Sequence, residues 1–161
     1  SGQGCWEHGV IEKTVANAAR LDYNREEWNM EILVIDGQGG GMGRGIVQEI
    51  KERLPQVRVR AVGTNSVATA NMRKAGADIS ATGENAVVVG ARHADYIIGP
   101  IGIVIADALY GEITPAMALA VGQSGAKRIL IPVNHCDNLV AGTQNLPMGQ
   151  LIQAAVRLIE E

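Results

Sequence analysis

A run of glycines behind a short apolar segment is the feature of this sequence whose spacing could do chemistry. The apolar segment is Glu31–Asp36, and the glycines that follow it lie at positions 37, 39, 40, 41, 43 and 45. Residues 46–54 then show the apolar spacing of a helix. A glycine loop between a strand and a helix lets backbone N–H groups approach an anion closely at the helix N-terminus. We therefore predict that the loop holds the phosphates of a nucleotide; the alternative is a tight structural turn with close helix–strand packing.

The spacing of these glycines differs from the G-x-G-x-x-G fingerprint of dinucleotide-binding folds. Gly37, Gly41 and Gly43 form G-x-x-x-G-x-G instead. Residues 34–46, VIDGQGGGMGRGI, are similar to the cofactor loop of short-chain dehydrogenases/reductases, and this resemblance implies NAD or NADP as the cofactor. The loop departs from that superfamily at Asp36, where the superfamily usually has Thr.

Asp36 places a carboxylate beside the predicted phosphate loop. An anion at this position repels a phosphate unless a cation or hydrogen bonds offset its charge. The carboxylate could instead cap N–H groups of the loop itself. The sequence leaves these roles open.

Catalytic residues are not assigned by the sequence. The Tyr-x-x-x-Lys pattern of short-chain dehydrogenases is absent, because Pro100 follows Tyr96 and Thr114 follows Tyr110 at that spacing. The candidates that remain lie after predicted strands or at the start of predicted helices, and they are Glu84, Asn85, Glu112, His135 and Cys136. The two glutamates are also explained as first-turn carboxylates favoured by the helix dipole, and the cysteine as a packed, inert residue.

A regular alternation of strands and helices must position these residues. Apolar and β-branched segments predict strands at 31–36, 57–62, 95–99 and 127–133, with a further short strand at 139–141. Helical spacing and capping residues predict helices over about 66–75, 85–94 and 115–125, and a last helix after residues 145–147 with an apolar stripe from Leu151 to Ile159. Residues 87–89 also read as a strand, but a helix over 85–94 is favoured because the strand at 95–99 needs a crossover before it. This pattern predicts a three-layer, Rossmann-like α/β sandwich with a mostly parallel sheet of about five strands, forming a single domain over residues 30–161.

Ligands of such sheets bind outside the carboxyl ends of the strands, where the strand order reverses. The glycine loop would hold the phosphates, residues 64–66 the ribose side and residues 99–100 the far side. An acid after the second strand would hold the adenosine ribose of NAD, but this chain has neither an acid nor an Arg there, so its small donors could hold a 2′-phosphate or another nucleotide. The predicted cofactor-binding residues are Asp36, Gly37, Gln38, Gly39, Gly40, Gly41, Met42, Gly43, Thr64, Asn65, Ser66, Gly99 and Pro100.

The composition argues against several classes of function. The net charge is −3 and no run of Lys or Arg occurs, so a nucleic-acid partner is not expected. The chain contains no apolar stretch near the ~18 residues that a membrane helix needs, so no membrane contact is expected. The two cysteines give no disulfide framework, and Cys5 and His8 lack the partners of a metal site. We expect a cytoplasmic protein without a bound metal.

Residues 1–29 are expected to form an extension outside the domain. A partial helical period predicts a helix over about 7–22. The chain starts with Ser-Gly rather than Met, which is what a cleaved tag could leave.

Short motifs spread over the whole domain resemble a known family. They are IDGQGGGMG (35–43), GTNSVAT (63–69), ATGENAVVV (81–89), GPIG (99–102), GEITP (111–115), ILIPVN (129–134) and NLP (145–147). Together they resemble a family of small bacterial proteins catalogued as a domain of unknown function. The resemblance implies a Rossmann-like fold and transfers no activity.

We therefore expect a nucleotide-binding protein that acts as a homo-oligomer, with NAD or NADP as the leading candidate ligand. It would be either a non-catalytic sensing or interaction module, which acts through an oligomer or a partner, or a small nucleotide-dependent enzyme. The size of the domain favours the module, because a cofactor leaves little of so short a chain to enclose a substrate.

Overall fold

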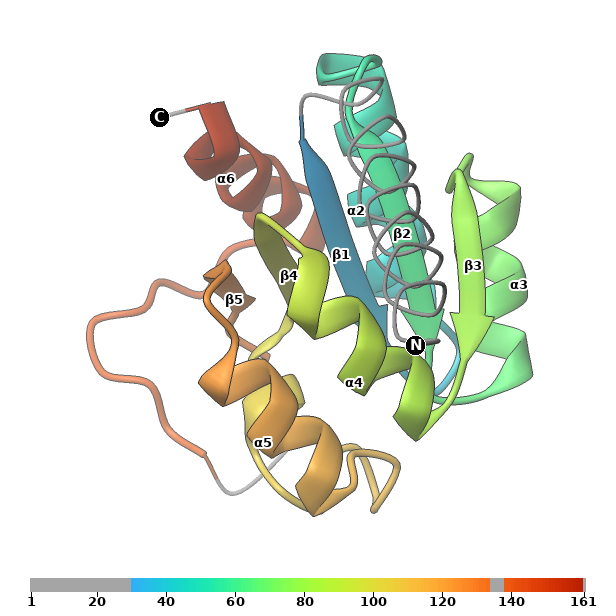
Figure 1. The fold of residues 1–161 in the computed structure, drawn as a ribbon. Helices are drawn as coiled ribbons and strands as arrows, with labels where there is room; N and C mark the ends of the chain where they lie inside the picture. Colours follow the sequence, from blue (N-terminus) through green and yellow to red (C-terminus); the bar gives the residue numbers. More distant parts are fainter. Residues whose placement is uncertain (1–29, 134–137, 161) are drawn as a thin grey trace, which may run out of the picture.

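The computed structural model describes residues 30–133 and 138–160, which form alternating strands and helices (Figure 1). The elements in chain order are β1 (Glu31–Asp36), α2 (Gly41–Arg53), β2 (Arg58–Gly63), α3 (Ser66–Lys74), β3 (Ile79–Thr82), α4 (Glu84–His93), β4 (Tyr96–Pro100), a 3-10 helix (Ile101–Val104), α5 (Pro115–Gln123), β5 (Lys127–Ile131) and α6 (Met148–Glu160). The predicted segment 1–29, with its helix, lies outside the described residues.

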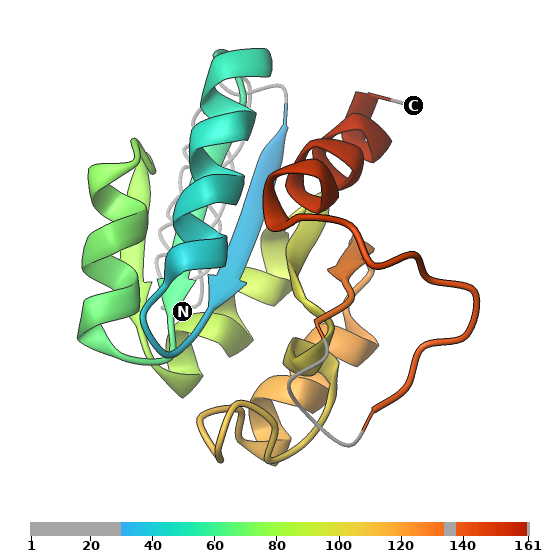
Figure 2. The same ribbon diagram turned by 180° about the vertical axis from the view of Figure 1, so that it is seen from behind.

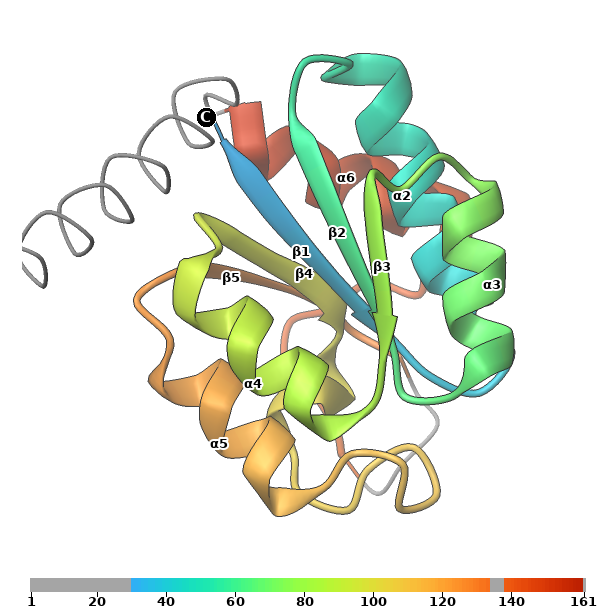
Figure 3. The same ribbon diagram turned by 45° about the vertical axis from the view of Figure 1, so that its right-hand side comes forward.

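The five strands form one sheet in the order β3-β2-β1-β4-β5, and every neighbouring pair is parallel. Helices α2, α3 and α6 cover one face, and α4 and α5 cover the other (Figures 2 and 3). The predicted three-layer α/β sandwich is confirmed, with a wholly parallel sheet. The strand order reverses between β1 and β4, because β2 and β3 add on one side of β1 and β4 and β5 add on the other.

Successive residues of the central strand point to opposite faces of the sheet and build two cores. Ile32 and Val34 pack with Ile46 of α2 in one cluster, and Leu33 and Ile35 belong to the other cluster with α4 and α5. All five side chains are at most 1% exposed. A strand buried on both faces has a continuous apolar sequence, which is why β1 can be predicted from the sequence.

Two of the sequence-based assignments are corrected by the structure. The predicted strand at 139–141 is wrong: these residues lie in the long connection to α6, where Leu139 is 98% exposed. The sheet instead gains β3 (Ile79–Thr82), which the sequence pattern did not reveal. This edge strand is four residues long and none of its residues is fully buried, so it carries no apolar run; backbone pairing with β2 defines it.

Within the described part of the chain, every helix is too short or too polar to span a membrane.

Candidate functional site

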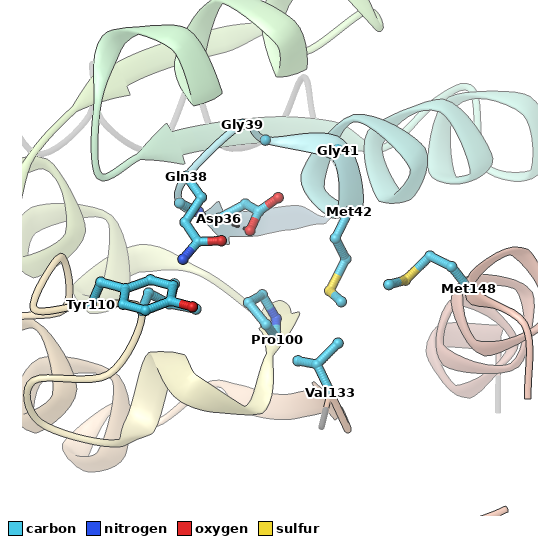
Figure 4. A pocket seen from close by; sticks show the side chains of 12 residues that line it. Asp36, Gln38, Gly39, Gly41, Met42, Pro100, Tyr110, Val133 and Met148 are labelled. Atoms are coloured by element: carbon cyan, nitrogen blue, oxygen red, sulfur yellow. Dashed lines mark hydrogen bonds between the residues drawn. The ribbon is translucent and has the colours of Figure 1, made fainter. Parts of the chain in front are cut away.

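A cavity of about 190 Å³ opens at the carboxyl ends of the strands, at the point where the strand order reverses (Figure 4). One wall is the glycine loop between β1 and α2, and the other comes from the ends of β4 and β5, a turn before α5, and the start of α6. The lining residues are Asp36, Gly37, Gln38, Gly39, Gly40, Gly41, Met42, Pro100, Leu109, Tyr110, Val133 and Met148. Open parallel sheets bind their ligands at this place.

The glycine loop is held against helix α3 by its carbonyl groups. Asn65 Nδ2 donates to the carbonyl oxygen of Gln38 at 2.9 Å, and Asn71 Nδ2 donates to that of Gly39 at 2.7 Å. Gly40 adopts a φ of +70°, and a Cβ there would lie 2.6 Å from the Cα of Ala68. The loop is therefore fixed on the side where its carbonyls face α3.

Packing explains some of the loop glycines but not all of them. A Cβ at Gly37 would lie 2.7 Å from Thr64 Oγ1, and one at Gly43 would lie 2.7 Å from the Cβ of Asp36, so both positions need the absence of a side chain. In contrast, a Cβ at Gly39 or Gly41 would meet nothing within 4 Å. The structural-turn alternative therefore accounts for Gly37, Gly40 and Gly43 and leaves two exposed glycines unexplained.

Three backbone N–H groups of the loop have no hydrogen-bond acceptor in the described part of the chain. They belong to Gly39, Gly41 and Met42, which line the cavity. Their neighbours are occupied, because the N–H of Gln38 donates to Glu112 Oε2 at 2.9 Å and that of Gly43 donates to Asp36 Oδ2 at 2.6 Å. Donors at a helix N-terminus, where the helix dipole is positive, form an arrangement that binds anions.

Asp36 caps the glycine loop with both of its carboxylate oxygens. Oδ1 accepts from the N–H of Gly37 at 2.8 Å and Oδ2 from that of Gly43, while the side chain is only 6% exposed. Burial raises the pKa of the Asp36 carboxyl above its usual range; the two hydrogen bonds oppose this shift, and the charge of Glu112 adds to it. Of the roles left open by the sequence, capping is the one seen in these hydrogen bonds.

Glu112 joins three segments that are distant in the sequence. Its Oε2 accepts from the N–H of Gln38, and its Oε1 accepts from Asn65 Nδ2 at 2.6 Å and from Thr64 Oγ1 at 3.2 Å. This residue precedes helix α5, which begins at Pro115, so it is not a first-turn carboxylate. A carboxylate is thus present at the end of β2, where the sequence shows none, because a residue from beyond β4 supplies it.

The turn that carries Glu112 has an unusual backbone. Asp107, Leu109 and Tyr110 have φ values of 64°, 56° and 56°, and Gly111 follows with 86°. Left-handed backbone costs an L-residue other than glycine about 1–2 kcal/mol, and such strain persists only where the surroundings impose it. The turn places Tyr110 at the cavity, across from the Met42 and Met148 side chains, although Tyr110 is 90% exposed (Figure 4).

Several of the predicted residues that the structure describes do not line the cavity. Glu84 and Asn85 are exposed at the start of α4, where Glu84 is a first-turn carboxylate. His135 and Cys136 lie outside the described residues. The other predicted binding residues that do not line the cavity are Gly43, Thr64, Asn65, Ser66 and Gly99. No cluster of three His, Cys, Asp or Glu side chains suited to a metal occurs among the residues described.

Sequence reasoning missed Asn71, Leu109, Tyr110, Val133 and Met148. None of them carries a local signal for a ligand, because each reaches the loop or the cavity only through the fold.

Comparison with protein families places the chain: residues 31–161 match the model of the family described as Domain of unknown function (DUF3842), and the chain belongs to that family. No match was found among curated proteins. The family assignment agrees with the resemblance seen in the motifs and carries no activity with it.

Proposed function

We propose that this member of the DUF3842 family binds a nucleotide by holding its phosphate on the glycine loop. The observation that carries the proposal is the group of N–H donors at Gly39, Gly41 and Met42, at the N-terminus of α2, for which the described residues supply no acceptor. In addition, no atom lies within 4 Å of the Cβ position at Gly39 or Gly41, so a phosphate can approach the backbone closely there. Position supports the same reading, because the donors lie where the strand order reverses.

NAD or NADP is the leading candidate among nucleotides. The support is the similarity of residues 34–46 to the cofactor loop of short-chain dehydrogenases/reductases. The other wall of the cavity, which includes Pro100, Val133 and Met148, is apolar and suits the flat face of a base or a nicotinamide ring.

The charge of Asp36 does not prevent such binding. Both of its oxygens already accept hydrogen bonds from the loop, which spreads the negative charge onto backbone dipoles. Because its pKa is raised, the Asp36 carboxyl becomes neutral at a higher pH than the carboxyl of an exposed aspartate. A phosphate bound nearby would favour that neutral form further, so we expect nucleotide binding to tighten as the pH falls toward the pKa of Asp36.

The direct test of this proposal is calorimetric titration with a panel of NAD, NADP, AMP, nicotinamide mononucleotide, ribose 5-phosphate and inorganic phosphate. We expect at least the nucleotides to bind. The Gly41→Val substitution should lower their affinity at least tenfold, because the branched side chain would project over the N–H donors. Gly125→Val, between α5 and β5, is the matched control, since a Cβ there meets nothing within 4 Å and the residue does not line the cavity. Absence of binding by every member of the panel would refute the proposal.

A non-catalytic module that acts through a second copy of the chain is the form of this function that the surface favours. Helix α5 lies in a stretch without charged residues from Ile113 to Ala126, yet Leu119 on its outer face is 58% exposed. A helix that is apolar all round is normally covered. The lining of the cavity also favours a non-catalytic role, because it offers few groups for acid–base chemistry. Of the described residues that line it, the titratable ones are Asp36, which caps the loop, and Tyr110.

The oligomer is tested by sedimentation equilibrium with and without the bound nucleotide. We expect a dimer that Leu119→Lys converts to a monomer. A wild-type protein that is monomeric at tens of micromolar would remove this part of the proposal.

A further inference from the structure

We propose that the turn from Asp107 to Glu112 restricts the site to contacts with one nucleotide unit of its ligand: Glu112 closes the β2 side of the glycine loop, and Tyr110 receives the aromatic ring of the ligand on the β4 side. This inference rests on the proposed function.

The β2 side of the loop is already filled. In a dinucleotide fold, the second half of the cofactor crosses the end of β2, where an acidic side chain holds its ribose. Here Glu112 accepts hydrogen bonds at that place from Gln38, Thr64 and Asn65. The remaining Asn65 donor goes to the Gln38 carbonyl oxygen, and Asn65 Oδ1 caps helix α3. These amide and carboxylate groups are therefore committed to one another.

The contact between Gly37 and its neighbours shows how close this closure is. A Cβ at Gly37 would lie 2.7 Å from Thr64 Oγ1, 3.0 Å from Leu109 Cδ1 and 3.3 Å from Glu112 Oε2. Two other segments, the end of β2 and the turn before α5, thus enclose the first glycine without space for one additional carbon atom. A ribose cannot enter between them unless the network opens, and opening it would leave half-buried polar groups without partners.

The β4 side of the loop is open and apolar. The cavity there is lined by Met42, Pro100, Val133 and Met148, and Tyr110 faces it with its ring and hydroxyl group (Figure 4). Within the family's domain, residues 31–161, the only other aromatic residue is Tyr96, whose ring lies 5.8 Å from Lys127 Nζ at the opposite end of β4. Among the described residues that line the cavity, Tyr110 is therefore the aromatic side chain that a ligand at the loop can meet.

The backbone of the turn supports a role in recognition. Leu109 and Tyr110 are held with positive φ, although Tyr110 is 90% exposed and gains little burial in return. Strain of this kind is concentrated where it serves a binding site. A single strained turn positions both the closing carboxylate and the open aromatic ring.

The cavity is too small to enclose a dinucleotide. Pockets that enclose drug-sized ligands have about 300–1,000 Å³, whereas this cavity has about 190 Å³. We therefore expect a phosphate, its ribose and one ring to make the contacts, and any second half of a dinucleotide to remain in solvent.

Calorimetric titration of the full chain with four probes tests the inference. NAD, AMP and nicotinamide mononucleotide each carry a ring, and ribose 5-phosphate carries none. We expect the better of the two mononucleotides to bind within about threefold of NAD. Tyr110→Ala should lower the affinity for that mononucleotide about tenfold, as expected for the loss of one stacking contact. The same substitution should leave the affinity for ribose 5-phosphate unchanged. Tyr110→Phe should retain the affinity, because the ring is kept.

The outcomes separate this inference from the function on which it rests. NAD that binds tenfold or more tightly than both mononucleotides would overturn the inference, because the second half would then contribute. Equal loss of mononucleotide and ribose 5-phosphate affinity in Tyr110→Ala would also overturn it, since stacking would not be the cause. If ribose 5-phosphate binds while Tyr110→Ala changes nothing, the loop proposal stands and only the inference fails. Fold is checked by the melting temperature, which an exposed side chain should leave unchanged.

Discussion

The two sides of the glycine loop are built in opposite ways. On the α3 side, the loop carbonyls accept from Asn65 and Asn71, and Glu112 accepts the Gln38 N–H. On the cavity side, the N–H groups of Gly39 and Gly41 have no acceptor in the described chain. One side is fully hydrogen-bonded and the other presents open donors.

This difference shows how a loop rich in glycine can be rigid. Glycine raises the conformational entropy of the unfolded chain, so an unsupported loop of this composition would be mobile. Hydrogen bonds to its carbonyls hold it in one conformation and leave its donors aligned. Alignment before binding lowers the entropy that a ligand must offset. The closed side therefore prepares the open side for its ligand.

The largest effect should come from breaking the closed side at Gly40. Gly40→Ala places a methyl group against the backbone of Ala68 in a left-handed conformation. We expect a loss of about 2–4 kcal/mol in the free energy of unfolding, measured by urea denaturation. Gly39→Ala is the matched control and should cost less than about 1 kcal/mol, because it meets nothing within 4 Å. Equal losses in both variants would contradict the two-sided description.

Asn65 allows the clamp to be separated from the helix cap. Asn65→Ser keeps a side-chain oxygen that can cap α3 but cannot reach the Gln38 carbonyl or Glu112, so we expect a loss of about 1–3 kcal/mol. Asn65→Ala should cost about 1 kcal/mol more, because the cap is lost as well. Urea denaturation measures both variants. If Ser restores wild-type stability, the cap alone matters and the loop is not clamped by this residue.

Asp36 gives a pH-dependent comparison. Because burial raises its pKa, the folded protein holds the Asp36 proton more tightly than the unfolded chain, whose aspartate pKa is about 3.9. Its contribution to stability is therefore fully present below about pH 3.9 and is lost as the pH rises through the folded pKa.

The corresponding measurement is the difference in unfolding free energy between wild type and Asp36→Asn across this range. The wild-type protein should lose stability relative to the variant as the pH rises, by about 1.4 kcal/mol for each pH unit between the two pKa values. A difference that grows in favour of the wild type with rising pH would show a lowered pKa and contradict the effect of burial.

The smallest effect is expected on the open side, at Tyr110. Asparagine tolerates left-handed backbone better than tyrosine does, and little packing is lost at a residue that is 90% exposed. Tyr110→Asn should therefore stabilise the protein by up to about 1 kcal/mol and lower its affinity for the nucleotide. Thermal denaturation and calorimetric titration measure the two effects. A variant that is destabilised would show that the tyrosine serves the fold rather than the site.

The sequence predicts the architecture well because the relevant signals are local. The apolar run of β1 and the glycines after it lie next to one another, and Thr114 caps α5 immediately before Pro115, as its type and position predict. The wrong assignments concern segments whose structure depends on residues distant in the sequence. Strand β3 is defined by pairing with β2, and the apolar residues Leu139 and Val140 have no sheet partner to make them a strand.

For the same reason, the sequence predicts only the part of the candidate site that lies next to its strands. The loop residues that line the cavity follow one another in the sequence, and they were predicted. Glu112 lies 74 residues from Gln38, and Asn71 lies 32 residues from Gly39. Neither separation leaves a pattern in a single sequence. Tyr110 has no neighbouring motif that points to a ligand, and only the fold brings it to the cavity.

Backbone amide signals, followed by NMR during titration with a mononucleotide, test most directly whether the open N–H groups of the glycine loop bind the phosphate. We predict that the amides of Gly39, Gly41 and Met42 shift most, because their N–H groups acquire an acceptor. The amides of Gln38 and Gly43 should shift less, because Glu112 and Asp36 already occupy them. Saturating ligand that leaves all three open amides unshifted, or shifts the two occupied amides more, would contradict the account.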